Sequence, residues 1–172
     1  MSSPRRELLR VAGVEPVGPY TLLRFERNMI ADAFKEREDR SRLLKLARRY
    51  VGPESGKLGD PVLRDRMTQV ELDQLALDLT LSRSRDRLKA GQPPGPEASI
   101  FKLYGTELNQ RRRDLMGAIA GPQALGWNGP GFTDEEVGMT RDWLRSRGNT
   151  IEGGTSEVQL NIIAKQVLGL PD

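Results

Sequence analysis

The sequence predicts an all-α protein, an antiparallel four-helix bundle with a short extra helix. Long segments carry apolar residues at three- and four-residue steps, and segments rich in Gly and Pro separate them. Neither a convincing pair of strands nor an internal repeat is visible. The 172 residues, 37% of them apolar, suit one domain with one core. We expect an irregular leader over 1–17 and the helical domain over 18–172.

The first two helices have clear ends. The first is predicted over 20–51, where a Gly-Pro pair at 52–53 ends it. Asp60 is a candidate N-cap, Pro61 suits the first helical position, and the second helix should run to about Lys89. Residues that share one face of this second helix are Leu63, Met67, Val70, Gln74, Leu77 and Leu81.

The third helix follows a connection that contains three prolines, over 90–96. It should end at the Gly-Pro pair at 121–122. Its predicted core face consists of Ile100, Leu103, Tyr104, Leu108, Leu115 and Ile119.

Two shorter helices complete the prediction. Thr133 and the acidic residues after it resemble a capping box, which opens a short helix that runs through Trp143. Thr155 or Ser156 should cap the final helix.

The composition excludes several kinds of chemistry. The chain has no cysteine and no histidine, so we expect no disulfide, no thiol nucleophile and no metal site. The net charge of +3 comes from interspersed basic and acidic residues, which makes nucleic acid an unlikely partner. No apolar run of about 18 residues and no secretory signal are visible, so we expect no membrane partner and a cytoplasmic location.

The C-terminal segment carries the most specific signal. It reads NTIEGGTSEVQ over 149–159 and continues as LNIIAKQVLGLP over 160–171. This resembles the closing signature of the acyl-CoA dehydrogenase family, in particular the bacterial type that ends in IxGGTSEIQ, NIIA and LGLP. Segments 60–66 and 99–110 resemble the openings of the second and third helices of the family's C-terminal domain. The resemblance therefore covers about residues 18 to 172.

The resemblance implies FAD as cofactor and an acyl-CoA thioester as substrate, in fatty acid metabolism. It also implies that the chain forms a homo-oligomer, a dimer or a tetramer. The cofactor-binding residues that it implies are Gly153, Gly154, Thr155 and Glu157. A second interpretation is that Gly154 turns the chain, Thr155 caps a helix and Glu157 occupies its first turn.

The family's reaction requires a carboxylate that removes the α-proton while a hydride leaves the β-carbon. Many members place this glutamate immediately before the Gly-Thr pair, where this chain has Gly153. Another subgroup carries it on the first helix of the domain, in a pattern similar to LRFER over 23–27. The resemblance therefore favours Glu26 as the catalytic base, with Glu152 as the alternative. An ordinary exposed helix glutamate at position 26 is the competing interpretation.

The family's N-terminal helical domain and middle β-domain precede this region in its full-length members. We expect them to be absent from this chain, and the chain to be weakly active or inactive by itself. Two other hypotheses are a non-enzymatic oligomerisation module of the same ancestry and, least favoured, a basic bundle that binds nucleic acid.

Overall fold

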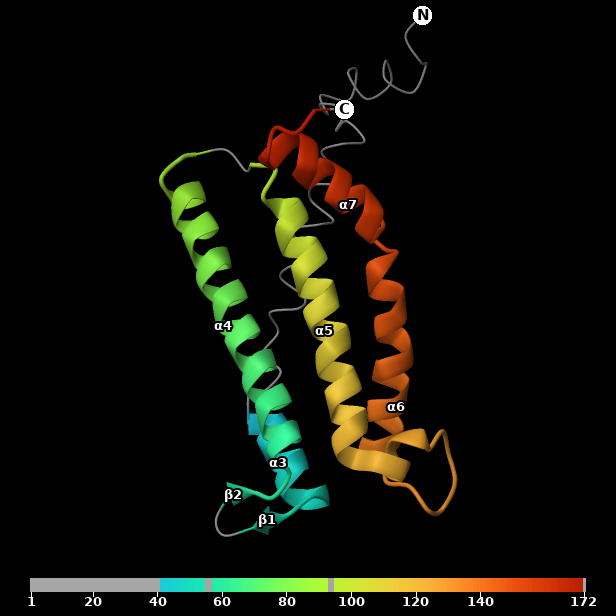
Figure 1. Cartoon of the computed structure of the whole chain (residues 1–172). Coiled ribbons are helices and arrows are strands. Elements are labelled where there is room, and N and C mark those ends of the chain that lie inside the picture. The colour runs from blue at the N-terminus through green and yellow to red at the C-terminus, as the bar shows by residue number, and fades with distance from the viewer. Residues whose placement is uncertain (1–40, 55–56, 93–94, 172) are drawn as a thin grey trace, which may run out of the picture.

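The computed structural model describes residues 41–54, 57–92 and 95–171 (Figure 1). Its helices are α3 (Ser41–Tyr50), α4 (Pro61–Lys89), α5 (Ala98–Ala120), α6 (Asp134–Ser146) and α7 (Ser156–Ile162). Single turns follow three of them: η1 (Gly121–Leu125), η2 (Arg147–Thr150) and the π-helical η3 (Ile163–Val167). The predicted all-α bundle is confirmed. The predicted leader over 1–17, and the predicted first helix up to residue 40, lie outside the described residues.

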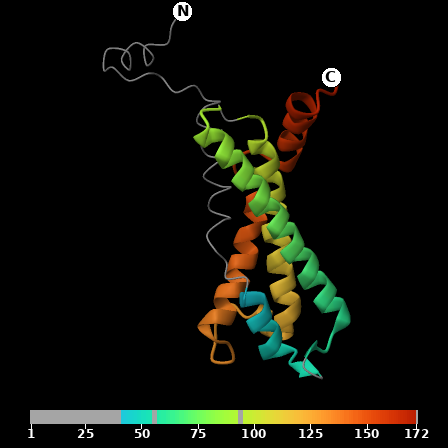
Figure 2. The same cartoon turned by 90° about the vertical axis from the view of Figure 1, so that its left-hand side faces the viewer.

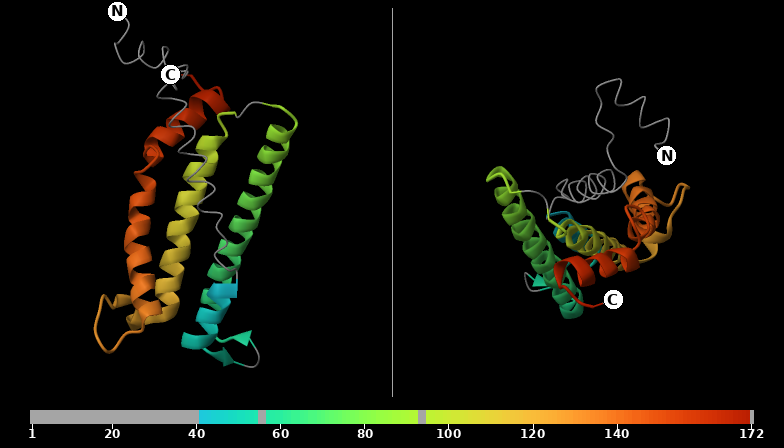
Figure 3. Two further views of the ribbon diagram at one scale, coloured as in Figure 1. Left: turned by 180° about the vertical axis from the view of Figure 1, so that it is seen from behind. Right: turned by 90° about the horizontal axis from the view of Figure 1, so that it is seen from above.

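The central element is α5. It packs against α3, α4, α6 and α7. Figure 1 shows α4, α5 and α6 side by side with α5 in the middle, and the view from above in Figure 3 shows the same order. The short helix α7 crosses the end of the bundle at which α5 begins (Figure 2). Each end of α5 therefore meets a different set of neighbours.

The helix ends follow local signals in the sequence. The Asp60 side chain accepts a hydrogen bond from the Leu63 amide (2.9 Å), and Pro61 begins α4 as predicted. Thr133 and Glu136 form a complete capping box at the start of α6. The predicted helix, which ends at Trp143, is too short. The helix continues to Ser146, and the chain then forms the tighter turn η2.

One small element was not predicted. Strand β1 (Pro53–Glu54) pairs antiparallel with β2 (Lys57–Leu58), and Pro53 lies opposite Leu58. Gly52, at φ 77°, turns the chain out of α3 toward this pair. Two residues per strand are too few to show an alternating pattern, which is why sequence periodicity missed the pair.

The core gathers around α5. On α4 the buried residues are Leu63, Val70, Leu77 and Leu81, all on the predicted face. On α5 Leu108, Leu115 and Ile119 are buried as predicted, whereas Phe101 is buried and Ile100, Leu103 and Tyr104 are only partly buried. Because helices surround α5 on several sides, its polar residues Lys102, Thr106 and Arg112 are buried too. A single apolar face could not predict this.

The longest helix of the described part, α4, carries charged residues along its whole length. Within the described ranges, no helix combines the length and the apolar character needed to cross a membrane.

Candidate functional site

The segment of greatest interest joins η2 to α7. We call residues 151–155 the tail loop. Gly153 and Gly154 have φ values of 66° and 96°. Residues with a Cβ rarely adopt this left-handed region, and two in succession reverse the chain sharply. The Gly-Gly sequence therefore permits this path of the tail loop.

Two fully buried polar side chains hold the tail loop from below. The Lys102 ammonium of α5 donates a hydrogen bond to the Gly154 carbonyl (2.7 Å). The Gln159 amide of α7 donates to the Gly153 carbonyl (2.9 Å) and, more weakly, to that of Gly154 (3.5 Å). Both side chains are 0% exposed. The carbonyl oxygens of both glycines are therefore satisfied from inside the protein.

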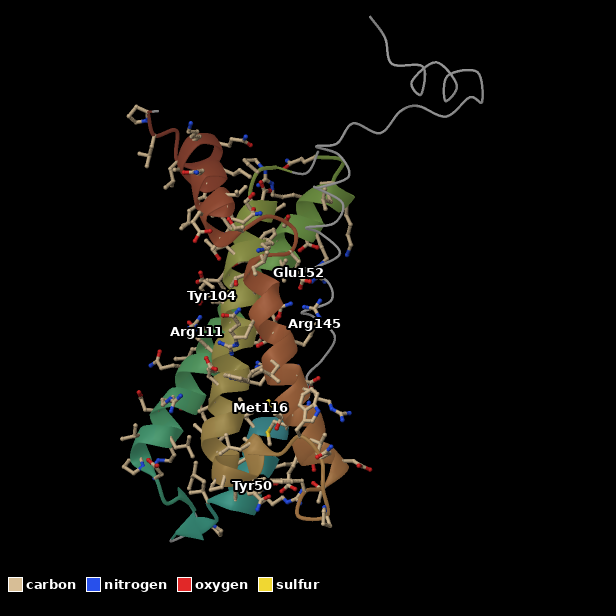
Figure 4. All side chains as sticks on the ribbon, turned by 90° about the vertical axis from the view of Figure 1, so that its right-hand side faces the viewer. Tyr50, Tyr104, Arg111, Met116, Arg145 and Glu152 are labelled. Carbon is tan, nitrogen blue, oxygen red and sulfur yellow. The ribbon has the colours of Figure 1, made fainter. Side chains whose placement is uncertain are left out.

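A second network of hydrogen bonds joins α5, α6 and η2 to Glu152 of the tail loop. The Asn109 amide of α5 donates to the Asn149 side-chain oxygen (2.8 Å), and Asn149 in turn donates to the Glu152 carboxylate. Arg145 donates to the other carboxylate oxygen of Glu152 (2.7 Å). Gln110 of α5 donates to the Ser146 carbonyl at the end of α6 (2.9 Å). The side chains of Arg145 and Glu152 lie next to each other at this end in Figure 4.

Both carboxylates of this region are held in the charged form. The hydrogen bond from Arg145 lowers the pKa of Glu152, and Asn149 adds to this effect against the opposing effect of burial. The Thr155 hydroxyl lowers the pKa of Glu157, and a hydrogen bond from the backbone amide of Glu157 lowers it further. The charge of Lys102 acts on both glutamates in the same direction.

Thr155 ends the tail loop as the N-cap of α7. Its hydroxyl accepts a hydrogen bond from the Val158 amide (3.4 Å), and Glu157 lies in the first turn of the helix. This is the capping arrangement that the sequence also allowed. The loop thus presents Thr155 and Glu157 beside a glycine pair that has no side chains.

Residues 26–168 match the family model described as acyl-CoA dehydrogenase, C-terminal domain. The chain belongs to this family. The acyl-CoA dehydrogenase IpdE1 of Mycolicibacterium smegmatis is 28% identical over 151 residues, which are 87% of this chain and 35% of that protein. The chain therefore spans about a third of the length of this curated relative.

Solved structures show the same helical fold. The FAD complex of PigA superposes with a TM-score of 0.66 at 23% identity, over 86% of this chain and 37% of PigA. The ChsE4-ChsE5 complex from Mycobacterium tuberculosis gives a TM-score of 0.61 at 22% identity, over 97% of this chain and 41% of that one. FAD is the cofactor of the acyl-CoA dehydrogenase family, and members of the family act on acyl-CoA and form oligomers.

The structure brings most of the expected acyl-CoA dehydrogenase site residues together. Gly153, Gly154, Thr155 and Glu157 belong to the tail loop and the first turn of α7, and Glu152 directly precedes the glycine pair. Glu26, the favoured base, lies outside the described residues. Its position relative to the tail loop is therefore a prediction.

Sequence reasoning missed the residues that support this loop. Lys102 lies in a helix, where a lysine usually extends into solvent, but here it is completely buried and binds the tail loop 52 residues later in the sequence. Gln159 belongs to the family signature but received no separate role. Asn149 carries no local pattern that distinguishes it from a surface residue. The only available signal was the family resemblance of segments 99–110 and 149–159.

Proposed function

We propose that this chain is the part of an FAD-dependent acyl-CoA dehydrogenase in which the tail loop contacts the flavin. We propose also that the whole enzyme oxidises the α,β carbon–carbon bond of an acyl-CoA thioester. The observation that carries the proposal is the conformation of the tail loop. Gly153 and Gly154 adopt left-handed backbone angles, and Lys102 and Gln159 hold their carbonyls inward. Such a loop can offer a flat, rigid edge to a planar ring.

The residues of the tail loop fit a flavin in two respects. Gly154, which is partly exposed while Gly153 is buried, lets a ring system approach the backbone closely. The Thr155 hydroxyl, which accepts a long hydrogen bond from the Val158 amide (3.4 Å) and interacts with the Glu157 carboxylate, provides a polar group beside Gly154. By family resemblance Gly153, Gly154, Thr155 and Glu157 would hold FAD, which accepts the hydride from the substrate.

Glu26 remains the proposed catalytic base. A base for a weakly acidic C–H group needs a free carboxylate oxygen and a pKa near the working pH. Glu152 accepts hydrogen bonds from Arg145 and Asn149, and its pKa is lowered. These contacts support a structural role for Glu152, and so they support the assignment of the base to Glu26.

The first test is the visible spectrum of the purified chain with and without added FAD, together with its mass by light scattering. We expect a flavin spectrum that stays with a dimer or tetramer. Gly154→Ala should weaken FAD binding at least about tenfold, because alanine is strained at φ 96°. The matched control is Gly91→Ala, which has a similar left-handed angle (φ 79°) in the α4–α5 connection. Equal FAD binding by wild type and Gly154→Ala would contradict the proposed loop function.

The base assignment is tested by turnover of acyl-CoA with the complete enzyme that contains this domain. Glu26→Gln should lower kcat by at least about 100-fold, the usual contribution of a general base. Glu152→Gln should change kcat only a few-fold, and it serves as the matched control. The reverse result would move the base to Glu152.

A second candidate function is a non-enzymatic oligomerisation module of the same ancestry. It is favoured by the outward face of α4, where Leu72, Leu75 and Leu79 are 54%, 43% and 59% exposed at helical spacing. A colourless chain that ignores FAD but forms a dimer or tetramer would select this function. In that case Leu72→Glu with Leu79→Glu should give a monomer.

We further propose, from the family resemblance, that the enzyme acts in fatty acid metabolism as a homo-oligomer and, from the absence of visible targeting signals in the sequence, that it acts in the cytoplasm. Salt-sensitive binding to nucleic acid would contradict this proposal.

A further inference from the structure

The tail loop is held by two residues that the reaction itself does not use, Lys102 and Gln159. They come from different helices, α5 and α7, and both donate to the Gly154 carbonyl. Gln159 also donates to the Gly153 carbonyl (2.9 Å). Their contacts therefore converge on the two left-handed residues of the loop.

Burial of these two side chains is costly for the stability of the fold. A lysine ammonium that is 0% exposed has lost its hydration, which its contacts must offset, among them the hydrogen bond to the Gly154 carbonyl and the nearby charges of Glu152 and Glu157. The Oε1 atom of Gln159 is buried with no hydrogen-bond partner in the described part of the chain, a further loss. Apolar residues of similar volume would fill the same space without these losses. We therefore look for the benefit of these two buried donors in the loop conformation that they favour, and not in the stability of the fold.

We propose that Lys102 and Gln159 are positioning residues, which hold the tail loop in one conformation and thereby set the position of the groups that it presents. A glycine pair left alone populates many backbone conformations. Donors fixed beneath both carbonyls select one of these and leave the outer side of the loop for a ligand. This inference rests on the proposed function for the identity of the ligand, but not for the rigidity of the loop.

The test is amide hydrogen exchange of the complete chain, with Lys102→Met as the first variant. Methionine keeps the length of the side chain and removes the donor. The probes are the amides of Ile151, Glu152, Val158 and Gln159, which donate to Gly148 and Thr155. We expect them to exchange about 10- to 100-fold faster, the loss that corresponds to a hydrogen bond from a charged group. The amides of Leu115 and Ile119 in the core should keep their rates.

The matched control is Thr106→Val. Thr106 is also 0% exposed on α5, one turn from Lys102, but its hydroxyl donates to the Leu103 carbonyl and not to the tail loop. It should leave the four probe amides unchanged. The inference is overturned if Lys102→Met leaves the probes unchanged, or if probe and core amides accelerate by the same factor, because either result denies a local role.

Gln159→Met provides an independent variant if Lys102→Met does not fold. It removes the donor to Gly153 and the unpaired oxygen together, and it should accelerate the same four amides. Unchanged probes in this variant would also overturn the inference.

Titration with FAD separates this inference from the proposed function. If the wild-type chain binds FAD, both variants should weaken binding about tenfold or more, and the conservative Thr106→Val should not. If the wild-type chain does not bind FAD, the proposed cofactor site fails in this chain. The exchange rates then decide the positioning role by themselves.

Discussion

The two ends of the bundle are held by different kinds of contact. At the end where α5 begins, buried Lys102 and Gln159 bind the backbone of an irregular loop. At the end where α5 finishes, the Tyr50 hydroxyl of α3 donates to Glu136 of α6 (2.6 Å), and Glu136 also closes the capping box with Thr133. Figure 4 shows Glu152 near the first end and Tyr50 at the second. The end where α5 finishes, the helix end, thus combines a local capping box with the long-range Tyr50–Glu136 bond, whereas the end where α5 begins, the loop end, depends on buried donors.

The largest effect should come from the core that both ends share. Leu108 lies near the middle of α5 and is 1% exposed. Leu108→Ala should lower the free energy of unfolding by about 2–5 kcal/mol, because it removes apolar contacts and leaves a cavity. Chemical denaturation measures the loss, and hydrogen exchange should show both ends loosening together. If one end kept its wild-type protection, the two ends would not share this core.

The two N-caps offer a sharper contrast. Thr133→Ala and Thr155→Ala each remove a capping hydroxyl, with a loss of about 1 kcal/mol. We expect Thr133→Ala to lower the denaturation midpoint of the whole domain, because α6 packs along α5. Thr155→Ala should mainly accelerate exchange of the Val158 and Gln159 amides, because α7 has only seven residues. Equal shifts of the midpoint in both variants would remove the contrast.

Alkaline pH should act on the Tyr50 contact at the helix end. Burial, with the hydrogen bond to Glu136 as the next cause, raises the pKa of Tyr50 from 10.0 to about 12. The protonated phenol is favoured in the folded state, so its contribution is complete below pH 10 and is lost as the pH rises through about 12.

Tyr50→Phe removes this contribution and should lower Tm at neutral pH by about 2–4 °C, the value of one hydrogen bond in a domain of this size. Thermal melts and the ultraviolet absorbance of the phenolate measure the two effects. If the phenolate absorbance near pH 12 were the same in Tyr50→Phe and in the wild type, Tyr50 would not titrate there.

The smallest effect should follow from the exposed ion pair beside the tail loop. The Arg145 and Glu152 side chains are 66% and 32% exposed, so Arg145→Ala should change stability by less than about 0.5 kcal/mol. The pKa of Glu152 should rise back toward 4.5, its ordinary value, because Arg145 is the main cause of its lowering. Its stabilising effect is present above that value and is lost as the pH falls. An NMR titration of the Glu152 side chain measures the change, and no rise in pKa would assign the lowering to Asn149.

Local signals were sufficient to predict the helix caps. Asp60, Pro61 and Thr133 at the helix end, and Thr155 at the loop end, act within three or four residues along the chain, so their roles as caps and first-turn residues could be predicted and are confirmed. The hydrogen bond between Tyr50 and Glu136, 86 residues apart, was not predicted. The short strand pair β1–β2 escaped prediction because two residues per strand show no period.

The loop end could be predicted only in part. The family signature located Gly153 to Glu157, but the buried Lys102 binds Gly154, which lies 52 residues later in the sequence, and no local rule indicates this contact. The predicted core face of α5 is confirmed at Leu108, Leu115 and Ile119 and was misplaced only at the start of the helix. A helix with neighbours on several sides has no single apolar stripe, so Ile100 and Leu103 are less buried than Phe101 and Lys102.

The glycine pair has a consequence for how this domain can vary over evolution. The path of the tail loop is encoded by two residues without side chains, and by donors that lie beneath it. Glu157, whose carboxylate is exposed in the first turn of α7, can therefore be exchanged while the backbone keeps its course. The residues that set the backbone path of this loop differ from those that set its surface charge, so related chains can change the ligand without a change of fold.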